Sequence, residues 1–214
     1  MKVLIFEGLD NVGKSTIAKM IADYYVQWYN VLFIHSRYPS SLCEDPFKYQ
    51  YDEFTTKAKM VRSLLKYEEV EADHPLEEAL VIMDRSWLDE YVYGQIYRKE
   101  KPDDIKNLIK DCFTLLKMQD IQVCIVHLKS DILLSIENDD SHSFTSTMEM
   151  DEKKSTVKNE QNLFNEIIEF CDYQGLCPHV DIYVTEDGEK TKFRNKQDIV
   201  DDVVKQLKFK DIEL

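Results

Sequence analysis

The sequence of 214 residues is poor in glycine, has no long apolar run and carries no excess of positive charge. Its five glycines compare with roughly 15 expected from average usage. No apolar segment approaches the roughly 18 residues that a membrane-spanning helix needs, and the strand-like start MKVLIF has no cleavage site, so we expect neither membrane insertion nor a signal peptide. The net charge of −14 argues against extended binding of nucleic acid, because such surfaces need clustered Lys and Arg.

The five cysteines include no C-x-x-C pair. Cys112 and Cys124 lie in apolar patterns, which predict buried thiols. Cys171, Cys177 and His179 are a loose set of possible metal ligands, but the sequence offers no fourth ligand at a zinc-type spacing. The pattern therefore favours reduced thiols and a cytoplasmic location, without a metal–thiolate site.

Hydrophobic periodicity predicts short buried strands that alternate with helices. The expected strands are 2–6, 31–35, 79–84, 121–128 and 180–184. The expected helices are 15–28, 47–69, 88–98, 104–118, 131–136, 163–171 and 197–207. This alternation indicates a parallel sheet that is covered on both faces. We therefore expect a single α/β domain over residues 1–214, a three-layer sandwich with five parallel strands.

Two of the scarce glycines bracket a loop with the pattern G-x-x-x-x-G-K-[ST]. The candidate phosphate-binding residues are Gly8, Leu9, Asp10, Asn11, Val12, Gly13, Lys14, Ser15 and Thr16. Backbone N–H groups of such a loop converge on phosphate oxygens, and the following helix adds its positive end. Lys14 is expected to reach the β- and γ-phosphates, and the Ser15 hydroxyl to ligate Mg²⁺. Because a strand precedes the loop and an amphipathic helix follows it, we predict a site for ATP and Mg²⁺.

A second motif follows the third expected strand, in the string IMDRSWLDEYVYG. Asp84 falls at the strand end, where a carboxylate can hold Mg²⁺ through water or accept a proton from a nucleophile. Arg85 offers a bidentate fork for a phosphate. We therefore treat Lys14, Asp84 and Arg85 as candidate catalytic residues. The guanine-reading string N-K-x-D does not occur, so a GTPase is not indicated.

Together these motifs resemble those of thymidylate kinases. FEGLDNVGKST is similar to that family's phosphate loop, and DRSWLDEYVYG is similar to its Asp-Arg motif, including a tyrosine nine positions on, Tyr93. Ser86 instead resembles the Glu-Arg-Ser motif of deoxynucleoside kinases, so the chain combines features of both families of P-loop kinases. The string DDSHSF is also similar to thymidylate kinase-like proteins of phages. The specific motifs cover about residues 3–21 and 80–95.

The resemblance implies a kinase that passes the γ-phosphoryl group of ATP to a pyrimidine deoxynucleoside monophosphate, dTMP in the first place. Asp10 matches the loop carboxylate that contacts the sugar 3′-hydroxyl of the acceptor. Arg37 and Arg62 are similar to arginines that hold the acceptor, and Arg85 would contact a phosphate. Tyr93 is a candidate for stacking on the base, although aromatics at helical spacing more often belong to a core.

One departure from the family concerns the catalytic cation. Thymidylate kinases usually supply it from within the phosphate loop or from an Arg-rich lid, but this loop carries Asn11 and the lid-like segment at about 137–156 contains no arginine. Charge that develops on a transferred phosphoryl group needs cations. Lys153, Lys154 or Arg194 substitutes, or Mg²⁺ and the strand-end arginine suffice, or the substrate differs.

Four functions remain open at this point. The first is a nucleoside monophosphate kinase, and the second is a deoxynucleoside kinase in which Asp84 is the general base for a 5′-hydroxyl. The third, a kinase acting on a modified base within DNA, is disfavoured by the charge of −14. The fourth is a nucleotide-binding homologue of low activity, which the arginine-free lid favours. The expected partner is a small-molecule nucleotide, with no membrane and no extended nucleic acid, and a homodimer is permitted.

Overall fold

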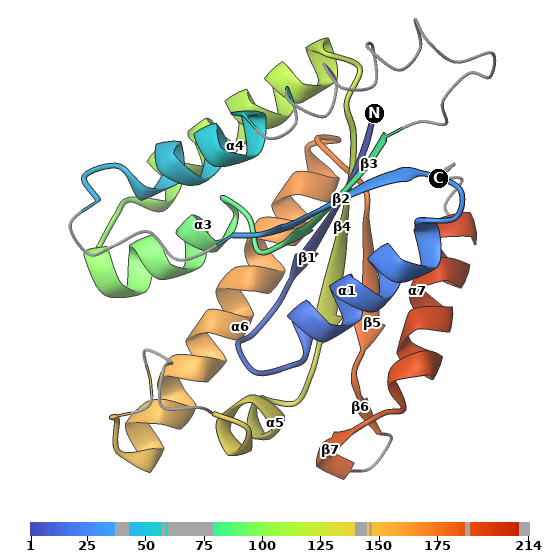
Figure 1. The fold of residues 1–214 in the computed structure, drawn as a ribbon. Coiled ribbons are helices and arrows are strands. Elements are labelled where there is room, and N and C mark those ends of the chain that lie inside the picture. The colour runs from blue at the N-terminus through green and yellow to red at the C-terminus, as the bar shows by residue number, and fades with distance from the viewer. Residues whose placement is uncertain are drawn as a thin grey trace, which may run out of the picture.

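The computed structural model describes residues 1–36, 43–56, 59, 79–139, 145, 147–186 and 189–209. A central sheet lies between two layers of helices (Figure 1). Its five strands are all parallel and lie in the order β2-β3-β1-β4-β5. The strands are β1 (Lys2–Glu7), β2 (Asn30–His35), β3 (Ala79–Asp84), β4 (Gln122–Lys129) and β5 (His179–Tyr183). The predicted three-layer α/β architecture is confirmed.

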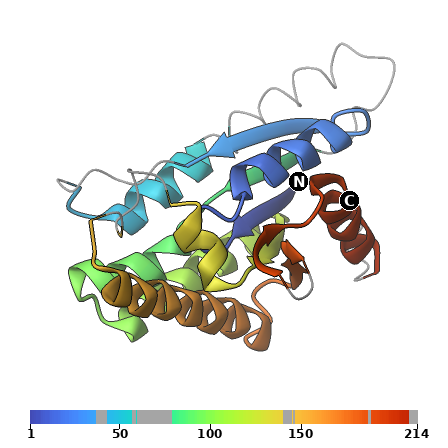
Figure 2. The same cartoon turned by 90° about the horizontal axis from the view of Figure 1, so that it is seen from below.

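Different helices cover the two faces of the sheet, and Figure 2 shows α1 and α6 on opposite sides of it. One face packs against α1 (Lys14–Tyr25) and α7 (Lys196–Phe209). The other face packs against α4 (Pro102–Met118), the carboxyl-terminal half of α6 (Met150–Tyr173) and the helical residues 46–56. Strand β3 is buried along its whole length, as an apolar run covered on both faces should be.

The smaller elements gather around the carboxyl ends of the strands. Helix α3 (Asp89–Tyr93) continues into a π-helical turn, η1 (Gly94–Arg98), and α5 (Ile132–Glu137) follows β4. Strands β6 (Thr185–Glu186) and β7 (Glu189–Phe193) form an antiparallel pair, and β7 packs against α5.

Two elements differ from the sequence-based expectation. The β6–β7 pair was not predicted. Helix α6 begins at Met150 rather than near residue 163, so residues 150–156 of the expected lid-like segment are the first turns of a helix. The polar composition of these turns explains the difference, because they lack the apolar spacing by which a helix is recognised.

Strand β1 occupies the centre of the sheet, with β3 on one side and β4 on the other. After β1 the chain builds β2 and β3 on one side of it, and then crosses to build β4 and β5 on the other side. Ligands of open α/β sheets bind in the crevice outside such a switch point. The register pairs Phe6 with Asp84 and Glu7 with His127. The segments that follow β1, β3 and β4 therefore emerge together at one edge.

No helix in the described part of the chain is both long and apolar enough to cross a membrane. Cys112 and Cys124 are buried, as their apolar surroundings predict, and Cys171 and Cys177 are buried too. Within the described residues, no group of three or more His, Cys, Asp or Glu side chains is placed to hold a metal ion.

Candidate active site

The loop between β1 and α1 has the backbone that a phosphate cradle requires. Gly13 adopts the left-handed conformation immediately before α1 (φ 86°), and Asn11 does so two residues earlier (φ 61°). Gly8 is required by space as well as by its φ of 138°, because a Cβ there would lie 2.5 Å from the carbonyl oxygen of Leu128. Helix α1 begins at Lys14, so its first N–H groups open onto this loop.

The ammonium of Lys14 lies inside the loop. It donates hydrogen bonds to the carbonyl oxygens of Gly8 (2.7 Å) and Leu9 (2.6 Å), and it lies 3.5 Å from Asp10 Oδ1. On the outer side of the loop, Ser135 Oγ of α5 donates to the carbonyl oxygen of Asp10 at 2.7 Å. The lysine is therefore held against the first residues of the loop, and α5 contacts the loop through Ser135.

Arg85 reaches the same loop from the end of β3. Its Nη2 donates to Asp10 Oδ1 at 2.6 Å, and its Nη1 lies 3.7 Å from Asp89 Oδ2. The backbone of Arg85 has a φ of 73°, a conformation that is uncommon outside glycine, and its N–H donates to the carbonyl oxygen of Phe6 at 3.3 Å. The structure thus brings together three predicted residues, Asp10, Lys14 and Arg85.

The charges in this group sustain one another. Burial acts to lower the pKa of Arg85, but the nearby carboxylates of Asp10, Asp89 and Asp84 outweigh it and raise that pKa. Burial acts to raise the pKa of Asp10, but the positive charges of Lys14 and Arg85 outweigh it and lower that pKa. Asp10 is therefore ionised and Arg85 is cationic, so the cationic fork remains intact over the whole physiological range.

Two further carboxyl groups lie beneath Arg85. Glu7 and Asp89 are both buried, and Ser86 Oγ donates to Glu7 Oε1 at 2.5 Å. Burial raises the pKa of both carboxyls, and the charge of Asp89 raises that of Glu7 further. Ser86 is fully buried, so the residue that resembles deoxynucleoside kinases contacts this carboxyl pair and does not face solvent.

Asp84 lies at the end of β3, on the side of β2. Its Oδ2 is 2.6 Å from Nδ1 of the half-exposed His35, and its buried Oδ1 has no hydrogen-bond partner among the described residues. Carboxylate and hydroxyl oxygens are the ligands that Mg²⁺ prefers, so Asp84 and Ser15 fit the donor set for this ion. Ser15 lines the cleft that is described next, whereas Asp84 is not among the residues that line it.

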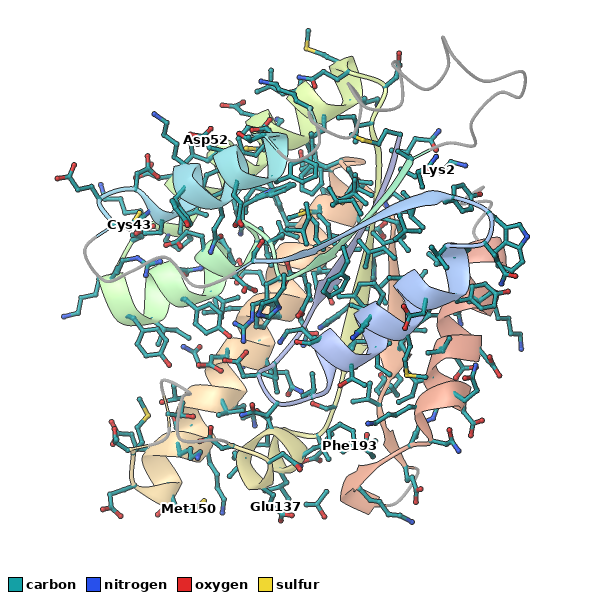
Figure 3. All side chains as sticks on the ribbon, viewed as in Figure 1. Lys2, Cys43, Asp52, Glu137, Met150 and Phe193 are labelled. Carbon is teal, nitrogen blue, oxygen red and sulfur yellow. The ribbon has the colours of Figure 1, made fainter. Side chains whose placement is uncertain are left out.

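A cleft of about 490 Å³ opens beside the loop. Its walls come from the phosphate loop, the end of α5 and the junction between β7 and α7. Phe193 contributes apolar surface and the almost fully buried Ile199 little of it, whereas Lys14, Arg85 and Lys196 contribute positive charge. Atom Cε1 of Phe193 is 3.7 Å from the point where a Cβ of Gly13 would stand, so the ring lies against the loop. Figure 3 shows Phe193 at the same end of the molecule as Glu137 of α5.

The β7–α7 wall of this cleft is not apparent from the two sequence motifs. Phe193, Lys196 and Ile199 are far from both motifs in the sequence, and the strands before them are short. One available signal is the dipeptide Asp187-Gly188, which is typical of a hairpin turn.

Of the three other predicted acceptor residues, the structure describes only Tyr93, and it lies away from this group. Tyr93 is buried, and its ring stacks on Tyr97 and meets the edge of Phe164, each with centroids 6.1 Å apart. Tyr93 is therefore a core residue beneath the site in this structure. Arg37 and Arg62 lie outside the described residues.

Two of the three candidates for the missing lid cation are already paired with carboxylates. Lys153 is paired with Asp139. Arg194 Nη2 is paired with Asp202 Oδ2 at 2.5 Å. Lys154 is exposed on α6, and none of these three cations is among the described residues that line the cleft.

Comparisons with known proteins bear on the fold. No family model matches the sequence, and no curated protein matches it. Polyphosphate kinase 2 from Arthrobacter aurescens TC1 superposes with a TM-score of 0.58 at 12% identity, covering 96% of this chain and 65% of that one. A chain assigned as polyphosphate kinase 2 from Pseudomonas aeruginosa PA01 gives 0.56 at 17% identity, covering 98% and 42%. Deoxyadenosine kinase from M. mycoides with bound dATP gives 0.47 at 16% identity, covering 97% and 100%.

These likenesses are all below 25% identity, so what they show is the fold. Only the two polyphosphate kinase 2 structures have TM-scores above 0.5, and the chain spans 65% and 42% of their lengths. The protein therefore shares the α/β fold of these two structures, with a five-stranded parallel sheet and the G-x-x-x-x-G-K-[ST] loop directly after its central strand.

Proposed function

We propose that the protein is a kinase that transfers the γ-phosphoryl group of Mg-ATP to a pyrimidine deoxynucleoside monophosphate, dTMP in the first place, giving the diphosphate. The observation that carries this proposal is the convergence of Lys14 and Arg85 on the phosphate loop beside a cleft. An in-line transfer to an acceptor phosphate needs cations and positioning but no strong base, because the attacking oxygen is already ionised. The choice of dTMP rests on the resemblance of the two motifs to thymidylate kinases.

Each residue has a defined part in this mechanism. The loop N–H groups and Lys14 hold the β- and γ-phosphates, and Arg85 neutralises charge on the phosphoryl group in transfer. Bound Mg²⁺ would supply further charge neutralisation, with Ser15 and Asp84 as the residues that fit it. Asp10 fixes the orientation of the Arg85 fork through the 2.6 Å bond.

The apolar part of the cleft favours ATP as the donor over inorganic polyphosphate, which the name of the similar Arthrobacter protein suggests. Phe193 and Ile199 line the cleft together with the loop. A purine base buries apolar surface against such side chains, whereas a polyphosphate chain has none to bury. The chain's net charge of −14 also disfavours a long polyanion.

Asp84 supports a second candidate, a deoxynucleoside kinase. Its buried Oδ1 is without a partner in the described part of the chain, and His35 holds the other oxygen. A carboxylate with one oxygen held by a hydrogen bond and the other without a partner is suited to accept the proton of a nucleoside 5′-hydroxyl.

The test is an acceptor screen with the purified protein. Mg-ATP or polyphosphate is offered with dTMP, thymidine, and the other nucleosides and monophosphates in turn, and each product is measured by chromatography. Turnover of ATP with dTMP but not with thymidine supports the first proposal. Turnover with thymidine alone, abolished by Asp84→Asn, supports the second. Tight binding of ATP without transfer to any acceptor contradicts both and leaves a nucleotide-binding protein of low activity.

A further inference from the structure

We infer that Lys196, at the start of α7, binds the phosphate chain of the donor and supplies the positive charge that the arginine-free lid lacks. This inference rests on the proposed function, in that the cleft is taken to hold ATP. Lys196 is one of three cationic side chains on the cleft wall, with Lys14 and Arg85. It comes from a different part of the chain from either motif.

Lys196 differs from Lys153 and Arg194 in its ion pairing among the described residues. No described carboxylate forms an ion pair with it, whereas Lys153 is held by Asp139 and Arg194 by Asp202. A cation that is already paired has to break that pair before it can bind a phosphate. Lys196 can bind one at no such cost, and its flexible stem can follow the donor as it binds.

The position of Lys196 in its helix also supports the inference. It is the first residue of α7, where the helix dipole favours negative charge and disfavours a cation. Figure 1 shows that α7 and α1 both begin at the end of the sheet where the loop lies. A bound phosphate would be attracted by Lys196 and by the α7 terminus together. Local choices that cost stability are expected at functional sites.

The neighbouring residues indicate which part of the donor Lys196 meets. Phe193, Lys196 and Ile199 line the cleft at three-residue intervals, opposite the loop. The Phe193 ring is suited to the base and the loop to the terminal phosphates, so Lys196 is assigned to the phosphates of the leaving ADP. In the transfer, the bond between the γ-phosphorus and the β–γ bridging oxygen breaks, and its electron pair remains on ADP. The acceptor oxygen forms the new bond, and Lys196 neutralises the charge that develops on ADP.

The experiment compares Lys196→Gln and Lys196→Arg with Lys205→Gln. Lys205 is an exposed lysine farther along the same helix and is not part of the cleft. Binding is measured for Mg-ATP and inorganic tripolyphosphate by calorimetry and for adenosine by NMR titration, which detects weak binding. Phosphoryl transfer is measured with the acceptor that the screen identifies, and thermal unfolding is measured without ligand.

We expect Lys196→Gln to weaken binding of ATP and tripolyphosphate about tenfold or more, since charge-assisted bonds to phosphate are strong, and to leave adenosine within twofold. Lys196→Arg should restore most of the loss, and Lys205→Gln should change nothing. The ligand-free melting temperature of Lys196→Gln should not fall, because a cation is removed from a helix N-terminus.

Two results would overturn the inference. One is unchanged binding of ATP and tripolyphosphate in Lys196→Gln, and the other is an equal loss for adenosine, which would make Lys196 part of the base wall. The same measurements on the wild-type protein test the proposed function separately. If the wild type binds ATP and transfers to no acceptor, the kinase proposal fails while the binding comparison still decides the role of Lys196. If the wild type binds neither ATP nor tripolyphosphate, both proposals are wrong.

Discussion

At the scale of single residues, the fork of Arg85 is the feature on which transfer most depends. Its Nη2 lies 2.6 Å from Asp10 Oδ1 and its Nη1 lies 3.7 Å from Asp89 Oδ2. The ammonium of a lysine cannot reproduce this planar two-sided geometry. We expect Arg85→Lys to lower kcat about 100-fold, because loss of one preorganised donor to a developing charge has effects of that size. The affinity for Mg-ATP should change much less.

Steady-state kinetics with the screened acceptor, together with calorimetric binding of Mg-ATP, tests this expectation. Circular dichroism of the variant controls for the fold. A variant with full kcat would show that Arg85 is structural, and one that loses ATP binding in proportion to kcat would place Arg85 in ground-state binding.

The buried carboxyl of Glu160 makes stability depend on pH. Burial raises its pKa from the ordinary 4.5 to about 7, against the lowering effect of a 3.0 Å hydrogen bond from Tyr97. The unfolded chain ionises this group above about 4.5, whereas the folded protein keeps the proton until about 7. Folding therefore loses stability as the pH rises through this interval, by up to roughly 3 kcal/mol above it.

Glu160→Gln removes this loss, and an amide oxygen can still accept the hydrogen bond from Tyr97. We expect the variant to melt higher than the wild type at pH 8, with a clearly smaller difference at pH 5. Differential scanning calorimetry at both values measures this. A variant that is destabilised by the same amount at both pH values would show that Glu160 is ionised and paired in the native state.

The residues that the sequence identified are those whose chemistry is local. Lys14 follows a glycine pattern and Arg85 follows a strand end, so a few neighbouring letters suffice to place them. The partner of Asp84 and the place of Lys196 on the cleft wall required the structure. The pairing of His35 with Asp84 depends on which strand lies beside β3, and Lys196 reaches the cleft only through the path of β6 and β7. Such neighbours are set by topology.

At the scale of elements, the junction of β1, β4 and the loop depends on the absence of a side chain at Gly8. A Cβ there would lie 2.5 Å from a backbone oxygen of Leu128, and backbone yields less readily than a side chain. Gly175 offers a matched control, with a φ of 62° and nothing within 4 Å of its notional Cβ. We expect Gly175→Ala to cost about 1 kcal/mol from backbone strain alone. Gly8→Ala should cost at least twice as much and abolish ATP binding.

Urea denaturation gives the free energy of unfolding of both variants, and calorimetry gives their affinity for Mg-ATP. Equal costs for the two variants would mean that the loop moves away from Leu128 without penalty. Retained ATP binding in Gly8→Ala would mean that the cradle does not need this close approach.

Elements with a buried face were predictable, and those without one were not. Strand β3 reads as an unbroken apolar run, and α4 carries its buried residues at helical spacing, so both were found with nearly the observed bounds. The first turns of α6 are polar, with Val157 the first buried apolar side chain. The two residues of β6 are too few to show an alternation.

At the scale of the whole molecule, the chain pairs a strongly negative total charge with a locally positive cleft. The net charge is −14, yet Lys14, Arg85 and Lys196 all line the same cleft. A compact anion gains from the local cations, whereas a long polyanion also meets the surrounding negative field. This contrast is the physical basis for expecting a nucleotide and not a nucleic acid.

Binding of Mg-ATP should therefore stabilise the whole fold. The phosphate loop, the end of α5 and the start of α7 lie far apart in the sequence, yet all three line the cleft. A ligand bound there contacts all three segments, and these contacts exist only in the folded protein. At 100 times the dissociation constant, a ligand that binds only the native state adds about 2.7 kcal/mol. For a chain of this size that is a rise in melting temperature of about 5–11 °C.

Differential scanning fluorimetry with Mg-ATP, adenosine and a short DNA duplex measures these shifts side by side. We expect Mg-ATP to raise the melting temperature by this amount, adenosine to raise it less, and the duplex to leave it unchanged. Because the cations and the apolar wall contribute separately, Lys196→Gln should reduce the shift with Mg-ATP toward the shift with adenosine. A shift with the duplex as large as that with Mg-ATP would contradict the charge argument and favour the third alternative, a kinase acting on a modified base within DNA.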